Sequence, residues 1–377
     1  MDFSFSEEQT LLRNSVEKYL ADNYTFENWR KFTRAEPGRD PVHWQQFAEL
    51  GLLAASLPED FGGLGGGAVE NMVVMEEFGK ALVVEPFVPT VVVGGGMIAR
   101  DGSKELKDEV LPRIAGGESI ISFAFAEPKS RFNLGDVSTT AKKQGASYVL
   151  NGSKAVVIGA PWADTLLVTA RTAGGQRDEK GVSVFLVDKK SKGIATRDYP
   201  TVDGQRASEI TLENVEVPAS RVIGEADNGL ALVERAADDA IAAYCAEATG
   251  AMKVLVDTTV EYSKTRKQFG VPIGKFQALQ HRMVDMFTSY QQSLSMTLMV
   301  TLHLNEDAAA RKKAASAAKV QIGRAGRYVG QEAVQIHGGI GMTDELNVGH
   351  YFKRLTMLDT LYGNVDYHLK RYAALSE

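Results

Sequence analysis

The sequence predicts an α+β protein with an N-terminal helical domain, a central antiparallel β domain and a C-terminal four-helix bundle. Apolar residues recur at helical spacing in the first third of the chain. Short segments with period two and glycine turn signals follow, and long alanine-rich amphipathic segments fill the remainder. We therefore expect domains at residues 1–117, 118–220 and 221–377.

The N-terminal domain is predicted to consist of helices. Ser6, which is followed by two glutamates, is typical of a helix start, and Asp40 before a proline is typical of a second one. Residues 58–67 contain five glycines and are expected to form a loop. Helical patterns then resume at 68–82 and 104–114.

The central domain is predicted to consist of short strands. Six segments are candidates: Ile120–Ala124, Tyr148–Leu150, Ala155–Ile158, Thr165–Ala170, Val182–Val187 and Ser208–Leu212. They are separated by Asn-Gly, Gly-Gly and Asp-Gly pairs, which favour turns. No long helical pattern intervenes, so an antiparallel sandwich or barrel is expected rather than a Rossmann unit.

The C-terminal domain is predicted to be a bundle of long helices. The amphipathic segments are Leu230–Arg266, Gln277–Leu304, Ala308–His337 and Glu345 to the C-terminus. Their connections are short, so consecutive helices are expected to pack side by side.

Composition excludes several classes of function. The net charge is −6 and the pI is about 5.7, so no electrostatic field favours nucleic acid or an anionic membrane. The only cysteine, Cys245, excludes an intramolecular disulfide, and the six histidines lack the paired spacing of a metal site. No apolar run approaches the ~20 residues of a membrane span. The acidic N-terminal stretch is unlike a secretory signal, so we expect a cytoplasmic protein without membrane insertion.

Two stretches of the bundle carry the strongest functional pattern. Arg266 can donate two parallel hydrogen bonds to a phosphate, and Phe269 can stack on a flat ring. Gly338 and Gly339 lack a Cβ and permit a close backbone approach. The glycines follow a helical segment rather than a strand, which excludes a Rossmann fingerprint.

Each feature has an ordinary structural explanation when it occurs alone. An isolated arginine is usually a solvated surface residue, and a glycine pair often ends a helix. Their occurrence together favours a site for an extended diphosphate with a flat ring system, such as FAD. The candidate cofactor-binding residues are Arg266, Phe269, Gln277, Gln335, Gly338 and Gly339.

The chain resembles the acyl-CoA dehydrogenases over nearly its whole length. The matching stretches are Glu7–Leu12, Pro58–Gly63, Leu111–Glu118, Gly224–Gly229, Tyr262–Gln277 and Gln335–Gly341. The resemblance implies the three-domain fold, FAD, an acyl-CoA substrate, an electron-transfer flavoprotein as electron acceptor and an assembly of four subunits. Gly94–Gly96 and His350–Arg354 are most similar to the small subunits of heteromeric enzymes of the pimeloyl-CoA dehydrogenase kind.

The general base that the resemblance implies is missing from its usual position. In the family a glutamate takes the α-proton of the acyl thioester, but the matching stretch here is Leu361–Asn364, which contains no glutamate. The other position used in the family falls on Ala240. Asp239 is therefore a candidate base, although one helical step rotates a side chain by about 100°. A solvated or capping carboxylate is the alternative, and the catalytic residue is otherwise unknown.

The central domain also departs from the family. The segments that contact the flavin ring in the family match Ala126–Asn133 and Val156–Gly159 here. Side chains that would hydrogen-bond the ring are replaced by aliphatic groups, which cannot do so.

The retained and missing elements suggest a division of work between subunits. In the family, one subunit holds the flavin ring and the bundle of its neighbour contacts the diphosphate and adenine. We hypothesise that this chain is a subunit of an FAD-dependent acyl-CoA dehydrogenase that completes the FAD site of a homologous large subunit. The alternatives are self-association, a non-catalytic structural subunit, and a flavin monooxygenase of the same fold.

Overall fold

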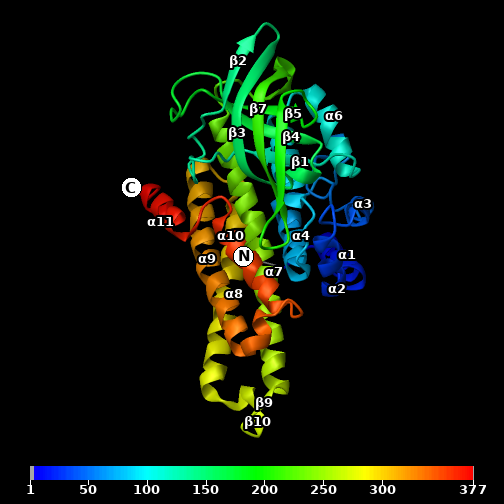
Figure 1. Ribbon diagram of the computed structural model, residues 1–377, viewed down its shortest axis with the longest axis vertical. Coiled ribbons are helices and arrows are strands. Elements are labelled where there is room, and N and C mark those ends of the chain that lie inside the picture. Colours follow the sequence, from blue (N-terminus) through cyan, green and yellow to red (C-terminus); the bar gives the residue numbers. More distant parts are fainter. Residues whose placement is uncertain (1–3, 377) are drawn as a thin grey trace. The chain divides into compact units, whose positions relative to one another are not determined.

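The computed structural model of the protein describes residues 4–376 (Figure 1). These residues form two compact units. The first unit contains the described residues up to Lys31, Ala68–Val83 and the residues from Ile241 onward, and the second contains Phe32–Gly67 and Val84–Ala240. Helices precede and follow a β sheet along the chain, which confirms the predicted fold class. The division into three domains stays a prediction.

The helices of the N-terminal third begin at residues whose side chains cap them. The Ser6 hydroxyl accepts a hydrogen bond from the Gln9 amide, and the Ser6 amide donates to the Gln9 side chain. Asp40 accepts from the Val42 amide at 3.0 Å. The α-helices are α1 (Glu7–Asn23), α2 (Phe26–Arg34), α3 (Pro41–Glu49), α4 (Ala68–Ala81), α5 (Gly96–Asp101) and α6 (Lys104–Ala115).

The β domain contains an eight-stranded sheet in the order β6-β7-β3-β2-β4-β5-β8, with β1 pairing parallel to β4. Its strands are β1 (Ile121–Ala124), β2 (Thr140–Gln144), β3 (Ser147–Ile158), β4 (Thr165–Arg171), β5 (Val182–Asp188), β6 (Ile194–Pro200), β7 (Arg206–Pro218) and β8 (Val222–Ile223). Most neighbouring strands are antiparallel, as predicted.

The sheet differs from the prediction in how its strands are divided. Tyr148–Leu150 and Ala155–Ile158 belong to one strand, β3, because Gly152 lies at a change of register rather than in a turn. A Cβ at Gly152 would lie 2.5 Å from the Thr139 hydroxyl, so glycine permits this close approach. Strands β2, β6 and β8 were not predicted; β2 and β6 are largely solvent-exposed and lack an alternating apolar pattern.

The C-terminal helices follow the predicted segments closely. They are α7 (Leu230–Thr265), α8 (Gln277–His303), α9 (Ala308–His337), α10 (Val348–Thr360) and α11 (Val365–Ala374), with a hairpin of β9 (Lys267–Gln268) and β10 (Val271–Pro272) after α7. The predicted fourth segment is two helices. Tyr362 and Gly363 have φ values of +58° and +119°, which interrupt the helix, and Asn364 then caps α11.

Two glycines allow α4 and α7 to pack closely inside the first unit. A Cβ at Gly79 would lie 2.0 Å from the Glu247 carbonyl oxygen, and one at Gly250 would lie 1.9 Å from that of Glu76. The two backbones are therefore in direct contact at both places. Nearby, Arg354 of α10 donates to both carboxylate oxygens of Glu247, at 2.5 and 2.8 Å.

Within residues 4–376, none of the helices is both long and apolar enough to cross a membrane. Across the same residues, no three His, Cys, Asp or Glu side chains gather in a way that could hold a metal ion. Cys245 is fully buried, and burial raises the pKa of its thiol to about 12.

Replacing Gly250 by alanine is expected to lower the free energy of unfolding by about 2 kcal/mol, as is usual for overpacked positions. Alanine favours a helix by about 1 kcal/mol over glycine, but the new methyl group would meet the backbone of α4. Urea denaturation measures the change. Gly67→Ala is the matched control, since a Cβ there meets nothing within 4 Å. A Gly250→Ala protein as stable as the wild type would contradict the close packing.

Candidate cofactor-binding site

A two-residue turn displays an aromatic ring at one end of the bundle. Gln268 pairs with Val271, and the turn residues Phe269 and Gly270 have φ values of +54° and +81°, as in a type I′ turn. This turn normally takes Asn-Gly, because a bulky residue is strained in the left-handed region. The Phe269 side chain is nevertheless 92% exposed. Strain is thus accepted at a residue whose ring contributes little to the core.

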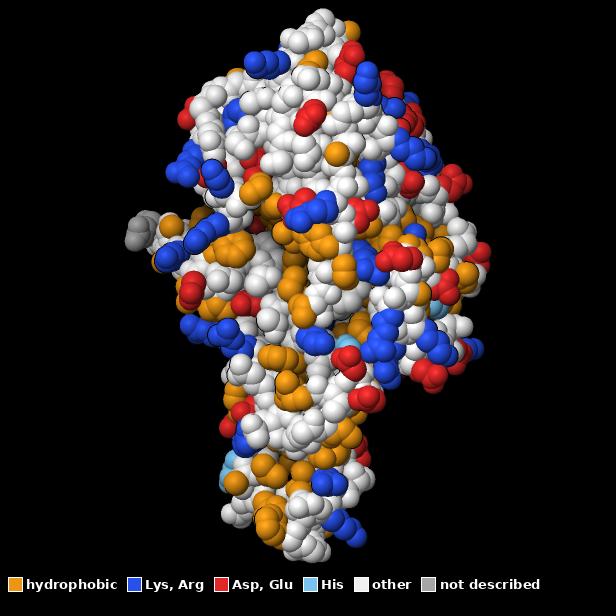
Figure 2. Space-filling view, in the orientation of Figure 1, with side chains coloured by type: hydrophobic (Ala, Val, Ile, Leu, Met, Phe, Trp, Pro, Cys, Tyr) orange, Lys and Arg blue, Asp and Glu red, His pale blue; other side chains and the backbone are white. Residues whose placement is uncertain are grey.

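Other apolar side chains at this end are also exposed: Phe276, Ile340 and Met342. Phe276 packs edge-on against Phe269, with ring centroids 6.1 Å apart. Figure 2 shows hydrophobic side chains gathered over the lower part of the bundle. Exposed apolar side chains gathered in one place are typical of a binding surface.

Arg266 precedes the hairpin and is exposed. Its backbone is anchored, because its amide donates to the Tyr262 carbonyl at 2.9 Å and its carbonyl accepts from the Ile273 amide at 2.8 Å. Its guanidinium, by contrast, makes no hydrogen bond or ion pair with any residue between 4 and 376. Arg266 therefore has a fixed backbone and a side chain that can reach an external anion.

The ends of α7 and α9 are joined by a pair of stacked rings. The rings of Tyr262 and His337 lie 4.3 Å apart at 28°, and the Tyr262 phenol donates to the His337 carbonyl at 3.3 Å. The Nδ1–H of His337 donates to the Ala333 carbonyl at 2.8 Å, and burial lowers the pKa of the imidazole, so the ring is neutral. This contact brings the two predicted stretches to one end of the bundle (Figure 1).

The glycines after α9 are open to the outside. Gly338 has φ +65°, whereas Gly339 has an ordinary φ, and a Cβ at either would meet nothing within 4 Å. Neither the backbone conformation nor the packing of the described residues requires glycine at 339. Gln335 on the last turn of α9 and Gln277 at the start of α8 are both exposed. All six predicted cofactor residues thus have accessible side chains or backbone.

Asp239, the candidate base, forms ion pairs with two arginines. It lies on α7 in the second unit, is 6% exposed, and binds Arg100 at 2.8 Å and Arg235 at 3.0 Å. The expectation of a solvated carboxylate is therefore wrong. The sequence did not reveal Arg100, because 139 residues separate it from Asp239.

The loop between α10 and α11, where the family glutamate would lie, is anchored by buried side chains. Burial and the nearby Lys319 ammonium lower the pKa of His368 to about 3, and its neutral ring donates from Nε2 to the Tyr362 carbonyl at 3.1 Å. The buried Lys319 donates to the Leu358 carbonyl at 2.6 Å. The loop is thus anchored at the Tyr362 carbonyl, and residues 361–364 contain no carboxylate side chain.

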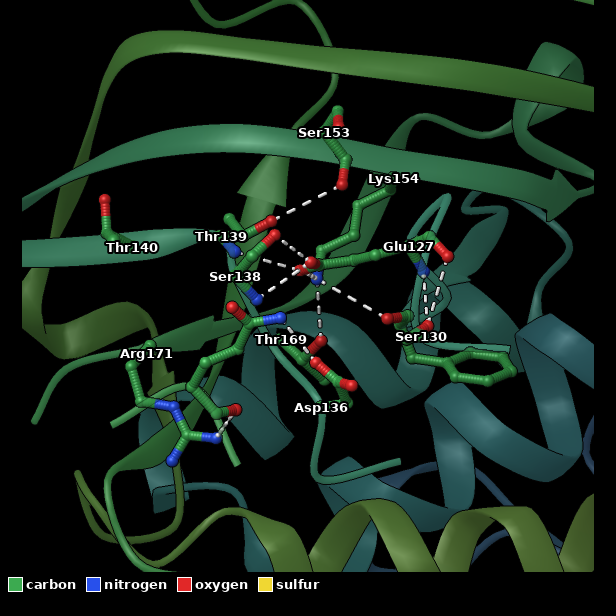
Figure 3. A network of polar contacts seen from close by, with 12 residues as sticks. Glu127, Ser130, Asp136, Ser138, Thr139, Thr140, Ser153, Lys154, Thr169 and Arg171 are labelled. Atoms are coloured by element: carbon green, nitrogen blue, oxygen red, sulfur yellow. Dashed lines mark hydrogen bonds and ion pairs between the residues drawn. The ribbon is translucent and has the colours of Figure 1, made fainter. Parts of the chain in front are cut away.

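A buried ion pair between Glu127 and Lys154 connects the segment 126–133 with β3 in the sheet domain (Figure 3). Glu127 accepts hydrogen bonds from the amides of Ser138 and Thr139, at 2.8 and 3.0 Å, and from Lys154 Nζ at 2.8 Å. Burial would raise the pKa of Glu127, but Lys154 and these hydrogen bonds lower it to about 2. Burial lowers the pKa of Lys154 to about 8 in spite of Glu127.

The strand that follows Lys154 contains a strained bulge. Val156 has φ +51° and is 47% exposed, at the point where the register of β3 against β7 shifts by one residue. Its amide donates to Glu209 at 3.3 Å, and the Tyr199 phenol donates to the same oxygen at 2.7 Å. The exposed face of the bulge carries an aliphatic side chain without hydrogen-bonding capacity.

Comparisons with known proteins place the chain in a family. The acyl-CoA dehydrogenase N-terminal domain matches residues 6–118, the middle domain 122–215 and the C-terminal domain 227–375. The acyl-CoA dehydrogenase FadE12 of Mycobacterium tuberculosis is 30% identical, over 92% of this chain and 90% of its own length. The acryloyl-CoA reductase (NADH) of Anaerotignum propionicum is 28% identical, over 98% and 94%.

Solved structures agree with these matches. The ChsE4-ChsE5 complex from Mycobacterium tuberculosis has 27% identity and a TM-score of 0.90, covering 100% of this chain and 99% of that one. The FAD complex of PigA has 26% identity and a TM-score of 0.91, covering 99% and 98%. The chain belongs to the acyl-CoA dehydrogenase family of FAD-dependent oxidoreductases, which confirms the predicted family, enzyme class and cofactor.

Replacing Glu127 by glutamine is expected to lower the free energy of unfolding at pH 7 by about 3–5 kcal/mol, because Lys154 would keep a buried charge without a partner. The carboxylate has an ordinary pKa of 4.5 and a pKa of about 2 when folded, so its contribution is complete above pH 4.5 and is lost as the pH falls toward 2. Urea denaturation between pH 7 and pH 2.5 should show a smaller loss on acidification in the variant.

The double variant Glu127→Gln with Lys154→Met is the control for this prediction. It removes both charges and should recover part of the lost stability. An unchanged acid dependence in Glu127→Gln would mean that Glu127 is not the carboxylate responsible.

Proposed function

We propose that the chain is a subunit of an FAD-dependent acyl-CoA dehydrogenase that introduces an α,β double bond into an acyl-CoA. Its bundle end completes an FAD site whose flavin ring lies in a homologous partner subunit. The observation that carries this proposal is the combination of Phe269, strained and exposed, with Arg266 and Gly339, which are open at the same end of the bundle. All three residues remain accessible to a ligand or a partner subunit.

The residues at the bundle end fit the adenosine diphosphate part of FAD. A guanidinium can form two parallel hydrogen bonds to phosphate oxygens, and an exposed ring can stack on adenine. Gly339 would allow the diphosphate or ribose to approach the backbone. The amides of Gln277 and Gln335 supply both donors and acceptors for the polar edges of the ligand. FAD, when bound, supplies the acceptor for the hydride that leaves the acyl chain.

The assignment of the flavin ring to a partner rests on three features of this chain. Residues 361–364 contain no carboxylate, and Asp239 is already paired with Arg100 and Arg235. Ala126 and Val156, at ring-facing positions of the family, cannot hydrogen-bond through their side chains. We therefore assign the general base to the partner and no catalytic residue to this chain.

The kind of partner is suggested by relatives. The ChsE4-ChsE5 structure is a complex of two differently named chains, and another neighbour, 26% identical with a TM-score of 0.91, is described as the electron transferring flavoprotein of Acidaminococcus fermentans. We propose a homologous large subunit in a heterotetramer, with an electron-transfer flavoprotein as acceptor and a cytoplasmic location. Association of the chain with itself is the alternative partner.

A non-catalytic structural subunit is the second candidate function. The absence of a carboxylate in the loop 361–364 favours it, whereas the open Arg266 guanidinium favours contact with a cofactor. Flavin content of the assembled protein distinguishes the two. Two relatives are named as reductases, so activity should be assayed as both oxidation and reduction.

Replacing Arg266 by alanine is expected to lower the FAD affinity of the assembled enzyme by about 100-fold, since a charge-assisted bidentate contact is worth roughly 3 kcal/mol. The chain is co-expressed with the product of a neighbouring homologous gene, and the complex is dialysed before bound flavin is measured. Arg327→Ala, which changes another exposed arginine of the bundle, should retain FAD. Full flavin content in the wild-type chain alone would contradict the proposal.

Replacing Gly339 by valine should separate cofactor binding from folding. A Cβ at this position meets nothing within 4 Å, so the melting temperature should stay within about 2 °C of the wild type. The added side chain should block the diphosphate and reduce flavin content of the complex by more than half. Unchanged flavin content would show that no ligand approaches this backbone.

A further inference from the structure

A cavity of about 390 Å³ in the first unit is not used by the proposed function. It lies where the last turns of α1 and α4 meet the start of α10, and none of the six residues assigned to the cofactor lines it. Pockets that bind small molecules usually have volumes of roughly 300–1,000 Å³. The cavity is therefore large enough for an organic ligand.

Most of the cavity wall is apolar. The larger apolar residues that line it are Leu20, Tyr24, Phe26, Leu82, Val254 and Tyr351. The Tyr351 phenol donates to the Lys80 carbonyl, so its hydroxyl is already engaged. Such a wall suits a hydrocarbon or aromatic body better than a sugar or a phosphate.

Leu82 holds its place in this wall in a strained backbone conformation. It follows the last residue of α4 and has φ +57°, the left-handed conformation in which helices usually place glycine. Leucine is less stable than glycine in this conformation, because its Cβ approaches a carbonyl oxygen. Burial of the side chain offsets part of this cost. Strained residues of this kind cluster at ligand sites.

A buried carboxylate interrupts the apolar wall. Glu77 of α4 lines the cavity, is 2% exposed, and accepts a hydrogen bond from Lys80 Nζ at its Oε1, at 2.7 Å. Its other oxygen, Oε2, accepts no hydrogen bond from a residue between 4 and 376. Burial raises the pKa of Glu77, although Lys80 acts to lower it. A buried carboxylate oxygen without a donor costs free energy, so this position favours a ligand that brings an N–H group.

The charge balance at the cavity is negative. Glu17 also lines it and makes no ion pair with a described residue. Among the described residues of the lining, Lys80 is the one cation, and it is bound to Glu77; the nearby Arg13 is bound to Glu76 at 3.2 Å. The helix dipoles largely cancel, because the carboxyl ends of α1 and α4 and the amino ends of α2 and α10 all lie at the cavity. The uncompensated carboxylate favours a cationic ligand over an anionic one.

We propose that this cavity binds an organic amine. The ammonium group donates to Glu77 Oε2 and is attracted by Glu17, and an apolar body of about one aromatic ring fills the apolar part of the cavity. The side-chain amide of Asn347, which makes no hydrogen bond with a described residue, supplies a further acceptor. The inference goes beyond the proposed function and does not depend on it, because the cavity shares no residue with the cofactor site.

Isothermal titration calorimetry on the full-length chain tests the proposal with three probes that share one hydrocarbon body. They are 3-phenylpropylamine, 3-phenyl-1-propanol and 3-phenylpropanoate, which are cationic, neutral and anionic at neutral pH. The amine should bind at least about 10-fold more tightly than the alcohol, since a charge-assisted hydrogen bond is roughly twice as strong as a neutral one. The carboxylate should bind most weakly. Equal affinities for the amine and the alcohol would overturn the proposal.

Glu77→Gln keeps the shape of the side chain and removes its charge. The affinity for the amine should fall at least about 10-fold, whereas the affinity for the alcohol should change by less than about twofold. Glu76→Gln is the matched control, because Glu76 is the preceding residue of α4 and does not line the cavity. It should leave both affinities unchanged. Glu17→Gln should weaken amine binding by a smaller factor than Glu77→Gln, since Glu17 is exposed and its charge is screened.

Ala21→Trp locates the binding and serves as the second variant if Glu77→Gln does not fold. Ala21 is exposed on α1 and lines the cavity, so a tryptophan there should fill the space without disturbing the core. Amine binding should be lost, with a melting temperature within about 2 °C of the wild type. Ser15→Trp, at an exposed position of α1 outside the lining, should bind the amine as the wild type does. The proposal fails if the wild-type chain does not bind the amine, or if Ala21→Trp still binds it.

Discussion

A buried carboxylate bound by a buried cation lies in each compact unit, and much of the remaining geometry depends on these two pairs. Lys154 binds Glu127 in the sheet unit, and Arg354 binds Glu247 in the helical unit. Moving an ion out of water costs several kcal/mol, so such pairs add little net stability. They do fix which segments meet. The first ties the loop 126–133 to β3, and the second joins α7 to α10, and an error in either pairing would leave an unpaired buried charge.

Segments that are anchored by hydrogen bonds can hold residues in strained conformations. Phe269, Arg131, Val156 and Tyr362 all have positive φ values without being glycine. Phe269 lies in the paired hairpin, and Arg131 follows the turn closed by Ser130. The Val156 amide donates to Glu209, and the Tyr362 carbonyl accepts from His368. Three of the four present exposed side chains. Strain of this kind persists where the surroundings over-determine the backbone, and it is most readily explained by contacts outside the chain.

The sequence predicted features that depend on neighbouring residues better than those that depend on distant ones. The bounds of α9 followed from its periodicity, and the structure shows Asp307 as its N-cap and Gly338 just beyond its end. The pair Asn151-Gly152 predicted a turn, but the structure shows a bulge within β3. The two cannot be told apart from this pair alone. For Asp239 the sequence left a base or a solvated or capping carboxylate open, because its partner Arg100 comes from another helix. The bundle-end residues were predicted from the chemistry of their residue types, whereas their exposure depends on the packing of distant segments and could not be predicted.

The division of the cofactor that we propose between two subunits is supported by the cost of unpaired polar groups. A flavin ring carries carbonyl and N–H groups along its edge, and each one left without a partner in a closed site costs about 1–3 kcal/mol. The ring-facing positions Ala126 and Val156 offer no side-chain partner, so a ring bound here would lose several such contacts. At the bundle end a diphosphate would find partners for its oxygens, because the exposed Arg266 guanidinium can bind them and the backbone at Gly339 is open. This difference in cost is the physical reason for our proposal that the ring lies in a more polar homologue and the diphosphate lies against this bundle.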